Sequence, residues 1–266
     1  MKAYVINLDR DPERMAHIER QGKQFGIDWH RVPATDKLDE GIAARAARAR
    51  PGLLGFTMSA GAIAVFESHR KVWKLIVASG DSHGAVFEDD VVCSKELPDL
   101  LSTAEWIPPD CDVMKLETFL ERATIRTKPA RLFSGRRIVR LYGRHLGACA
   151  YIISRRAAER LLAQSENFTD PVDEFLFNAQ SLHFPRLTLY QVDPAPCIQG
   201  GLLDLEGKAG YMKSSNDQNL KLRKKPYRNL VHYLTRKVVR LWGKLLELFG
   251  YRERRRIEFR PDRARD

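Results

Sequence analysis

This sequence has no apolar run that approaches the roughly 20 residues needed for a membrane-spanning helix. It also has no internal repeat and no low-complexity linker. Its first nine residues are typical of a strand rather than of a secretory signal peptide. These absences argue against an integral membrane protein or a repeat array, and they lead us to expect a cytoplasmic protein.

Cysteine is scarce and scattered. The chain has four cysteines, with no C-x-x-C pair among them: Cys93, Cys111, Cys149 and Cys197. Free thiols in a reducing compartment fit this pattern. Isolated cysteines are more often core residues than metal ligands, so we expect neither disulfides nor a cysteine metal site.

The charge is unevenly placed along the 266 residues, which carry a net charge of +11. Residues 221–266 hold 16 basic and 5 acidic residues, which accounts for the whole excess. The length is enough for one large domain with an appendage. We therefore expect a neutral domain over residues 1–220 and a basic tail over residues 221–266.

Strand and helix patterns alternate along the first 200 residues, which predicts an α/β fold with a mixed, mostly parallel sheet flanked by helices. The expected strands are 3–8, 27–32, 85–87, 112–116, 137–142, 148–153 and 187–192. The expected helices are 11–25, 41–50, 60–79, 95–106, 155–164 and one that begins near residue 170. Residues 118–136 are basic and irregular, and we expect a mobile loop there.

Three adjacent carboxylates, Glu88, Asp89 and Asp90, directly follow the apolar strand at 85–87. Ligands of open α/β sheets bind beyond the carboxyl ends of the strands. Alternation along an extended chain would direct Glu88 and Asp90 to one side and Asp89 to the other. Such a pair suits Mg²⁺ or Mn²⁺. The alternative is a solvated acidic turn, but the apolar strand that leads into the acids favours a site.

Other polar residues stand at comparable places. Asn7, Arg10 and Arg14 follow the first strand and begin the first helix, a position that suits a nucleotide's base or phosphates. The arginines could equally form surface ion pairs with neighbouring acids. His69, beside Ser68, lies on the apolar stripe of the helix at 60–79; it is either a core residue or a site residue.

A further group of acidic residues, Asp170, Asp173 and Glu174, stands where a helix is expected to begin. Asp173 could act as a general base held ionised by the helix N-terminus, or it could have only a capping role. Gln199, in an expected loop, could reach a metal or a substrate hydroxyl, or bond to backbone.

Six of these segments, in this order, resemble glycosyltransferase family 25, the bacterial lipopolysaccharide sugar transferases and their collagen-galactosylating relatives. Each segment alone is weak, but six at suitable intervals over about residues 3–200 are specific. They are VINLDR at 5–10 with Glu13 and Arg14, FESH at 66–69 with Trp73, VFEDDV at 86–91, DVMKLE at 112–117, GACAYIIS at 147–154 and PVDEFL at 171–176.

The resemblance implies a GT-A-like nucleotide-diphospho-sugar transferase fold for residues 1–220, a UDP-sugar donor, often UDP-galactose, Mn²⁺ (or Mg²⁺), and transfer with inversion to a saccharide acceptor. By this similarity Asp90 and Glu88 hold the metal. Asp173 is the expected catalytic base, with Glu174 and Glu117 in reserve. The implied donor-binding residues are Asn7, Leu8, Arg10, Arg14, Ser68, His69, Glu88, Asp89, Lys115 and Glu117.

The basic tail carries an apolar stripe at helical spacing, typical of an amphipathic helix at a membrane surface. Attachment to the inner face of the cytoplasmic membrane would bring the enzyme to a lipid-linked acceptor. Alternatively, the stripe packs on the domain or on a second copy. The stripe consists of Leu230, Leu234, Val238, Leu241, Trp242, Leu245 and Phe249. The flanking basic residues are Arg236, Lys237, Arg240, Lys244, Arg252, Arg254, Arg255 and Arg256.

Two readings from other classes remain open. A nucleic-acid-binding protein could use the basic tail, but the rest of the chain is neutral and lacks an aromatic RNA-binding motif, so no nucleic acid is expected. The second interpretation is a catalytically idle, sugar-binding scaffold protein of the same fold.

Overall fold

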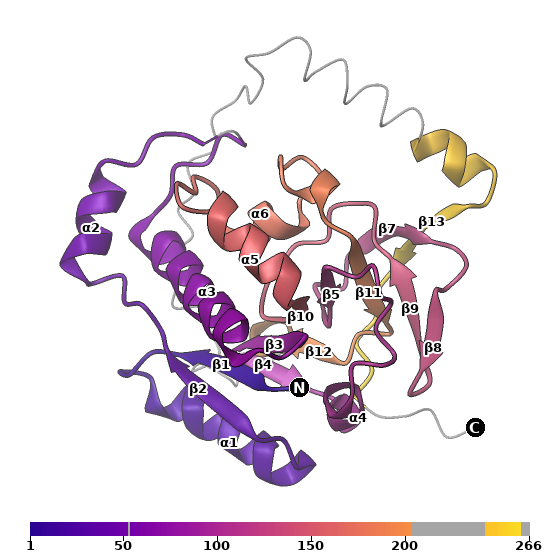
Figure 1. Cartoon of the computed structure of the whole chain (residues 1–266), viewed down its shortest axis with the longest axis horizontal. Helices are drawn as coiled ribbons and strands as arrows, with labels where there is room; N and C mark the ends of the chain where they lie inside the picture. Colours follow the sequence, from indigo (N-terminus) through magenta and orange to yellow (C-terminus); the bar gives the residue numbers. More distant parts are fainter. Residues whose placement is uncertain (53, 204–242, 262–266) are drawn as a thin grey trace.

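The structure, a computed structural model, describes residues 1–52, 54–203 and 243–261. An eight-stranded sheet forms its centre, in the order β2-β1-β3-β10-β5-β11-β9-β8 (Figure 1). From one edge to the other, the strands are β2 (Trp29–Pro33), β1 (Ala3–Asn7), β3 (His83–Glu88), β10 (Ala150–Ser154), β5 (Val113–Lys115), β11 (Leu189–Asp193), β9 (Arg136–Arg140) and β8 (Arg131–Phe133).

The sheet is mixed. Within the described ranges β9 and β10 run against the other six strands, which share one direction. The expected mixed and mostly parallel sheet is therefore present. The parallel pairs β2-β1-β3 bring the carboxyl ends of β1 and β3 to the same edge.

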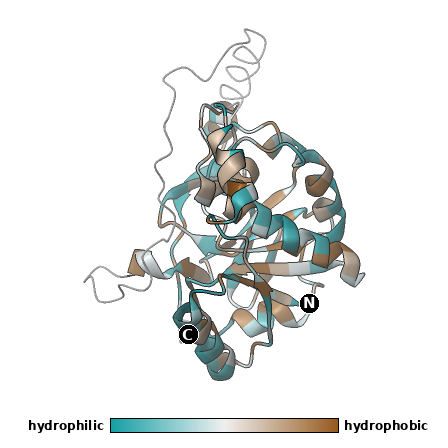
Figure 2. Cartoon of the chain, turned by 90° about the vertical axis from the view of Figure 1, so that its left-hand side faces the viewer, coloured by the Kyte–Doolittle hydropathy of each residue, from teal (hydrophilic) through white to brown (hydrophobic). Residues whose placement is uncertain are grey.

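Helices cover both faces of this sheet, and the apolar sequence of β3 reflects this. Val86 packs into the core shared with Phe66 and Trp73 of α3 (Ala60–Ser79). Its neighbours Ala85 and Phe87 face the other core, shared with α1 (Pro12–Phe25) and α4 (Leu97–Ser102). A strand buried on both faces has no polar side to display. In Figure 2 hydrophobic and hydrophilic colouring alternate along both the helices and the strands.

Local signals set the helix ends. The Ser59 hydroxyl accepts a hydrogen bond from the Ala62 amide at 3.1 Å and so caps α3. Pro12 begins α1, and Gly26 ends it with a φ of 73°, a left-handed conformation that favours glycine. The remaining helices are α2 (Glu40–Ala47), α5 (Arg155–Gln164), α6 (Val172–Phe177), α7 (Gly200–Leu203) and the 3-10 turn η1 (Phe184–Arg186).

The expected loop at 118–136 is wrong in part, because it contains two strands. β7 (Arg122–Arg126) pairs with β13 (Arg252–Arg256), and β8 pairs with β9. Residues 194–199, also expected as loop, contain β12 (Cys197–Gln199), which pairs with β4 (Val91–Cys93) and β6 (Glu117–Thr118). Several of these paired strands are distant from each other in sequence, so no local sequence pattern predicts the pairing.

The end of the basic segment packs on the domain. β13 runs antiparallel to β7, and Ile257 is fully buried. The Thr118 hydroxyl donates a hydrogen bond of 2.6 Å to the Ile257 carbonyl. Thus residues 252–257, which the sequence division at 221 places in the tail, are part of the folded body.

The stripe positions 230, 234, 238, 241 and 242 lie outside the described residues. Leu245 and Phe249 are described, and both are exposed. Within the described ranges, no helix combines the length and apolarity needed to cross a bilayer.

Candidate functional site

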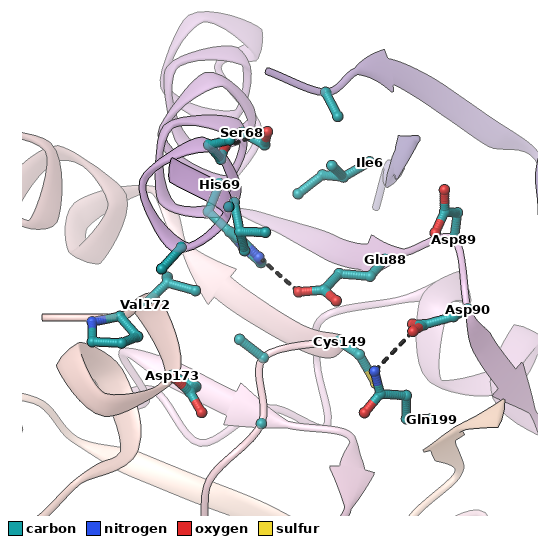
Figure 3. A pocket seen from close by; sticks show the side chains of 18 of the residues that line it. Ile6, Ser68, His69, Glu88, Asp89, Asp90, Cys149, Val172, Asp173 and Gln199 are labelled. Atoms are coloured by element: carbon teal, nitrogen blue, oxygen red, sulfur yellow. Dashed lines mark hydrogen bonds and ion pairs between the residues drawn. The ribbon is translucent and has the colours of Figure 1, made fainter. Parts of the chain in front are cut away.

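A cavity of about 360 Å³ opens at the carboxyl ends of β1 and β3. Its walls come from the end of β1, the start of α1, the first half of α3, the β3–β4 turn, β6, the loop before β10, the start of α6, and Gln199. Figure 3 shows Glu88, Asp90, Asp173 and His69 around one space. The topology therefore gathers chemistry-bearing side chains from segments that are remote in sequence.

The three acids of the β3–β4 connection all line this cavity. Asp89 and Asp90 form a turn and do not continue the strand, so the expected alternation of an extended chain does not apply. Each carboxylate instead has its own partner: His69 for Glu88, Arg14 and Asn7 for Asp89, and Gln199 for Asp90.

Asp89 is held on both oxygens. Arg14 Nη1 donates to Oδ1 at 2.7 Å, and Asn7 Nδ2 donates to Oδ2 at 2.8 Å. Asn7 is buried, accepts a hydrogen bond from Arg31 Nε at 2.9 Å and does not line the cavity. Asn7 therefore positions Asp89 and Arg14 rather than a ligand directly.

Asp90 has one satisfied and one unsatisfied oxygen. Gln199 Nε2 donates to Oδ2 at 2.8 Å (Figure 3), and Arg14 Nη2 lies 3.8 Å from the same oxygen. Oδ1 is buried, and no described residue bonds to it. Burial, and then the charge of Glu88, raise the pKa of Asp90 to about 7. An orphaned buried carboxylate oxygen is costly, so this oxygen is available to a ligand.

Glu88 lines the cavity and also contacts side chains of the core. His69 Nε2 lies 3.2 Å from Glu88 Oε1, and His69 Nδ1 lies 2.9 Å from the Tyr151 hydroxyl. Trp73 Nε1 donates to that hydroxyl at 2.8 Å. Burial, and then the charge of Glu117, raise the pKa of Glu88 to about 8. Burial also lowers the pKa of His69 to about 4, so the imidazole is neutral near pH 7.

Glu117 is fully buried at the cavity wall. It accepts hydrogen bonds from Lys115 Nζ at 3.1 Å, the Cys149 amide at 2.7 Å and the Cys149 thiol at 2.8 Å. Lys115 does not line the cavity; its ammonium also donates to the Gly147 carbonyl and lies 4.3 Å from the Phe177 ring centroid. Lys115 therefore neutralises and positions Glu117 from behind, and three donors leave Glu117 little capacity as a base.

Asp173 lines the cavity at the start of α6. Its Oδ1 accepts a hydrogen bond from the Glu174 amide at 2.8 Å. Burial, followed by the charge of Glu174, raises the pKa of Asp173. Glu174 bonds to Arg144 at 3.2 Å and to Asn178. The Gly147 backbone is a further hydrogen-bond partner of Asp173. Asp173 is thus held by backbone groups, whereas Glu174 and Glu117 each bond to a basic side chain.

Leu8, Arg10 and Ser68 also line the cavity. Arg10 forms an ion pair with Asp36. The Ser68 hydroxyl accepts from the Thr35 amide at 2.8 Å and donates to the Ala64 carbonyl at 2.8 Å. Ser68 therefore joins the β2–α2 connection to α3 and has little capacity left for a ligand.

Ten of the twelve predicted site residues line the cavity, whereas Asn7 and Lys115 stand behind it. Sequence reasoning missed Tyr151 as a partner of His69, Trp73 as a partner of Tyr151, and Cys149 as a partner of Glu117. The alternation of a buried strand gave no sign that the Tyr151 hydroxyl meets a helix. The individual roles of all these residues stay predictions.

Residues 1–176 match glycosyltransferase family 25, described as a family of LPS biosynthesis proteins. The lipooligosaccharide biosynthesis protein lic2B of Haemophilus influenzae is 30% identical over 209 residues, which cover 75% of this chain and 76% of that protein. The lacto-N-neotetraose biosynthesis glycosyltransferase LgtE of Neisseria meningitidis serogroup B is 30% identical over 211 residues, 75% of this chain and 74% of that protein.

A solved glycosyltransferase involved in glycosylation of the major capsid of PBCV-1 aligns with 75% of this chain and 92% of its own, at 8% identity and a TM-score of 0.37. The sequence match over residues 1–176 alone spans more than half of the 266 residues. The chain belongs to glycosyltransferase family 25, a family of sugar-transferring enzymes.

Proposed function

We propose that this enzyme transfers a hexose, with galactose as the first candidate, from a UDP-sugar to a saccharide acceptor of lipopolysaccharide or lipooligosaccharide. The transfer is a single displacement with inversion on a GT-A-like fold. The observation that carries the proposal is the cavity where Asp90 presents an unpartnered buried oxygen beside Arg14. The names of the relatives, in lipooligosaccharide and lacto-N-neotetraose biosynthesis, support the acceptor class.

A divalent cation, Mn²⁺ or Mg²⁺, fits this cavity. Asp90 Oδ1 is the carboxylate oxygen that would hold it, because hard cations prefer oxygen ligands and often take the remainder from substrate phosphates. No cluster of three His, Cys, Asp or Glu residues able to hold a metal occurs within the described ranges, so substrate oxygens would have to supply the remaining ligands. When bound, the cation would offset negative charge on the leaving diphosphate.

The remaining roles belong to the chain's own side chains. Asp173 accepts the proton of the acceptor hydroxyl as that oxygen attacks the anomeric carbon. A raised carboxylate pKa suits a general base, since proton transfer is most effective when the pKa lies near the working pH. Arg14, already fixed by Asp89, provides positive charge for the diphosphate side of the cavity.

The deciding experiment is a screen of UDP-sugars for UDP release with and without Mn²⁺ and a saccharide acceptor. We expect one UDP-hexose to give acceptor-dependent release, and proton NMR of the product to show inversion at the anomeric carbon. Binding of a UDP-sugar with no turnover would favour an idle scaffold and would contradict the proposal.

We also propose that the C-terminal segment binds the surface of an anionic membrane. Among the described residues, Leu248, Phe249 and Tyr251 are 80%, 67% and 64% exposed. They precede the basic strand β13, on which Arg254 and Arg255 are exposed. Apolar side chains beside basic ones match the chemistry of an anionic bilayer, where each basic residue contributes about 1 kcal/mol.

Flotation with vesicles that contain an anionic lipid tests this second proposal. Removal of residues 226–266 would also remove β13, so point variants are sharper. Leu248→Ser with Phe249→Ser should reduce flotation. Leu132→Ser, at a residue 74% exposed on β8, should leave it unchanged. Equal flotation of all three proteins would exclude this surface, and a shift of DNA or RNA in its place would favour nucleic-acid binding.

A further inference from the structure

Four side chains form one hydrogen-bonded line from the core to the cavity: Trp73, Tyr151, His69 and Glu88. The three links are 2.8, 2.9 and 3.2 Å long. Trp73, His69 and Tyr151 are fully buried, whereas a quarter of the Glu88 side chain is exposed to the cavity. Trp73 and His69 belong to α3, Tyr151 to β10 and Glu88 to β3, so the line joins three elements.

The direction of every hydrogen bond in this line follows from counting protons. An indole nitrogen donates only, so the Tyr151 oxygen accepts from Trp73. Tyr151 has one hydroxyl proton, and His69 Nδ1 is its only acceptor among the described residues. If His69 Nδ1 carried a proton, the Tyr151 proton would be buried without a partner, at a cost of about 1–3 kcal/mol.

His69 Nδ1 is therefore an acceptor, and a neutral imidazole then carries its proton on Nε2. That N–H donates to Glu88 Oε1. No described residue bonds to the other oxygen, Oε2, and Glu88 lines the cavity. Glu88 thus has one oxygen fixed from within the protein and one directed to a ligand.

We propose that Trp73 and Tyr151 are positioning residues that hold His69 as an Nε2–H donor, so that Glu88 presents a single oriented oxygen to a hydroxyl of the donor sugar. The sugar part rests on the proposed function; the tautomer of His69 does not. Asp89 is unsuited to this role, because both of its oxygens are already occupied. Asp90 Oδ1 remains for a cation.

Nitrogen-15 NMR of the full chain, labelled at histidine, tests the tautomer directly. The His69 signals are assigned by comparison with His69→Gln. We expect an unprotonated Nδ1 and a protonated Nε2 in the wild-type protein at neutral pH, and loss of this single tautomer in Tyr151→Phe. A wild-type His69 protonated at Nδ1 would overturn the proposal, whatever the activity of the enzyme.

Kinetics and binding test the consequence for Glu88. We expect Tyr151→Phe to lower kcat/KM for the UDP-sugar about tenfold, equivalent to about 1.4 kcal/mol. Affinity for UDP alone, measured by calorimetry, should stay unchanged. The matched control is Tyr190→Phe, which removes a hydroxyl bonded to Asp110 at 3.0 Å outside the cavity. Unchanged kcat/KM in Tyr151→Phe, or an equal loss of affinity for UDP and UDP-sugar, would contradict the assignment.

A second pair of variants tests the proposal independently, in case the Tyr151→Phe protein does not fold. His69→Gln keeps an N–H donor for Glu88, whereas His69→Leu does not. We expect His69→Gln to retain more UDP-sugar turnover than His69→Leu at equal thermal stability. Equal activities would overturn the donor role. A wild-type enzyme inactive with every UDP-sugar would refute the proposed function, and the NMR result would still decide the tautomer.

Discussion

At the scale of single residues, the site is a set of carboxylates that differ in how many partners each has. Glu117 accepts from three donors, and Asp89 from two. Asp90 and Glu88 each keep an oxygen that no described residue bonds to. Since a substrate or cation needs an available oxygen, we propose that Asp90 and Glu88 are the residues that contact the ligand. Asp89 and Glu117 instead shape the wall around them.

Asp173→Asn separates chemistry from binding. We expect transfer to fall by about 10²–10⁴, the usual contribution of a general base, because an amide takes no proton from the acceptor. UDP binding in the presence of Mn²⁺ should stay close to that of the wild type. Turnover and calorimetry measure the two effects. Near-normal turnover would remove Asp173 from this role, and loss of both would indicate a structural role.

The pH dependence of stability follows from the raised pKa values of Asp90, about 7, and Glu88, about 8. Unfolded carboxyls ionise near pH 4. The folded protein therefore holds extra protons at intermediate pH, and this stabilisation disappears as pH rises toward 8. The pKa of His69, lowered to about 4, and that of His145, lowered to about 3, act in the opposite sense, but only below about pH 6.5.

In the absence of divalent cations, we therefore expect the melting temperature to fall between pH 6.5 and 8. Asp90→Asn removes one of the acids with a raised pKa and should flatten this slope. Mn²⁺ should raise the melting temperature more at pH 8 than at pH 6.5, because the cation competes with protons for the same oxygens. Thermal melts in EDTA and in Mn²⁺ measure both effects. A slope unchanged in Asp90→Asn would show that other groups titrate.

At the scale of elements, the loop before β10 brings the wall residues together. Gly147 has a φ of 93°, and its carbonyl accepts from Lys115. A Cβ atom at this position would lie 2.2 Å from the Phe119 ring and 2.8 Å from Glu117 Oε2. Glycine is therefore required here both by conformation and by space.

Gly147→Ala should disturb the cavity as well as the fold. We expect a larger loss of stability than in Gly26→Ala, whose φ is 73° but whose added Cβ meets nothing within 4 Å. The control should lose about 1–2 kcal/mol from the left-handed conformation alone, with activity retained. Denaturant unfolding and turnover of both variants provide the comparison. Equal stability and activity in the two would exclude the predicted clash.

At the scale of the whole molecule, the C-terminal segment has two distinct parts. Residues 252–257 complete the body through β13 and Ile257, whereas Leu248 and Phe249 are exposed. The Ile257 carbonyl bonds to Thr118, the residue after Glu117. The end of the chain therefore supports the strand that carries part of the cavity wall.

Ile257→Ala should cost about 2–5 kcal/mol, as for other fully buried isoleucines, and should leave vesicle binding intact if the protein remains folded. Leu248→Ser should have the reverse effect, with stability nearly unchanged and flotation reduced. Chemical denaturation and flotation of the same two variants test this separation. An Ile257→Ala protein as stable as the wild type would show that β13 contributes little to the body.

Local sequence patterns were sufficient to predict many of the elements of this molecule. The caps at Ser59 and Gly26, the apolar strand 85–87 and the acids that follow it are all determined by neighbours in the chain, through hydrogen bonds and periodic burial that act over a few residues. Family membership was likewise visible in six short segments. Those segments led to the acids, to His69 and to Asp173, without reference to their contacts.

Only the tertiary structure decided which residues meet. Tyr151 and His69 are 82 residues apart, as are Asn7 and Asp89, and Thr118 and Ile257 are 139 apart. Such contacts depend on strand order and helix packing, which leave no periodic trace in the sequence. The sequence by itself therefore determined which chemical groups the enzyme has and where its elements begin. The fold decided which carboxylate oxygens are occupied and which are left for a ligand.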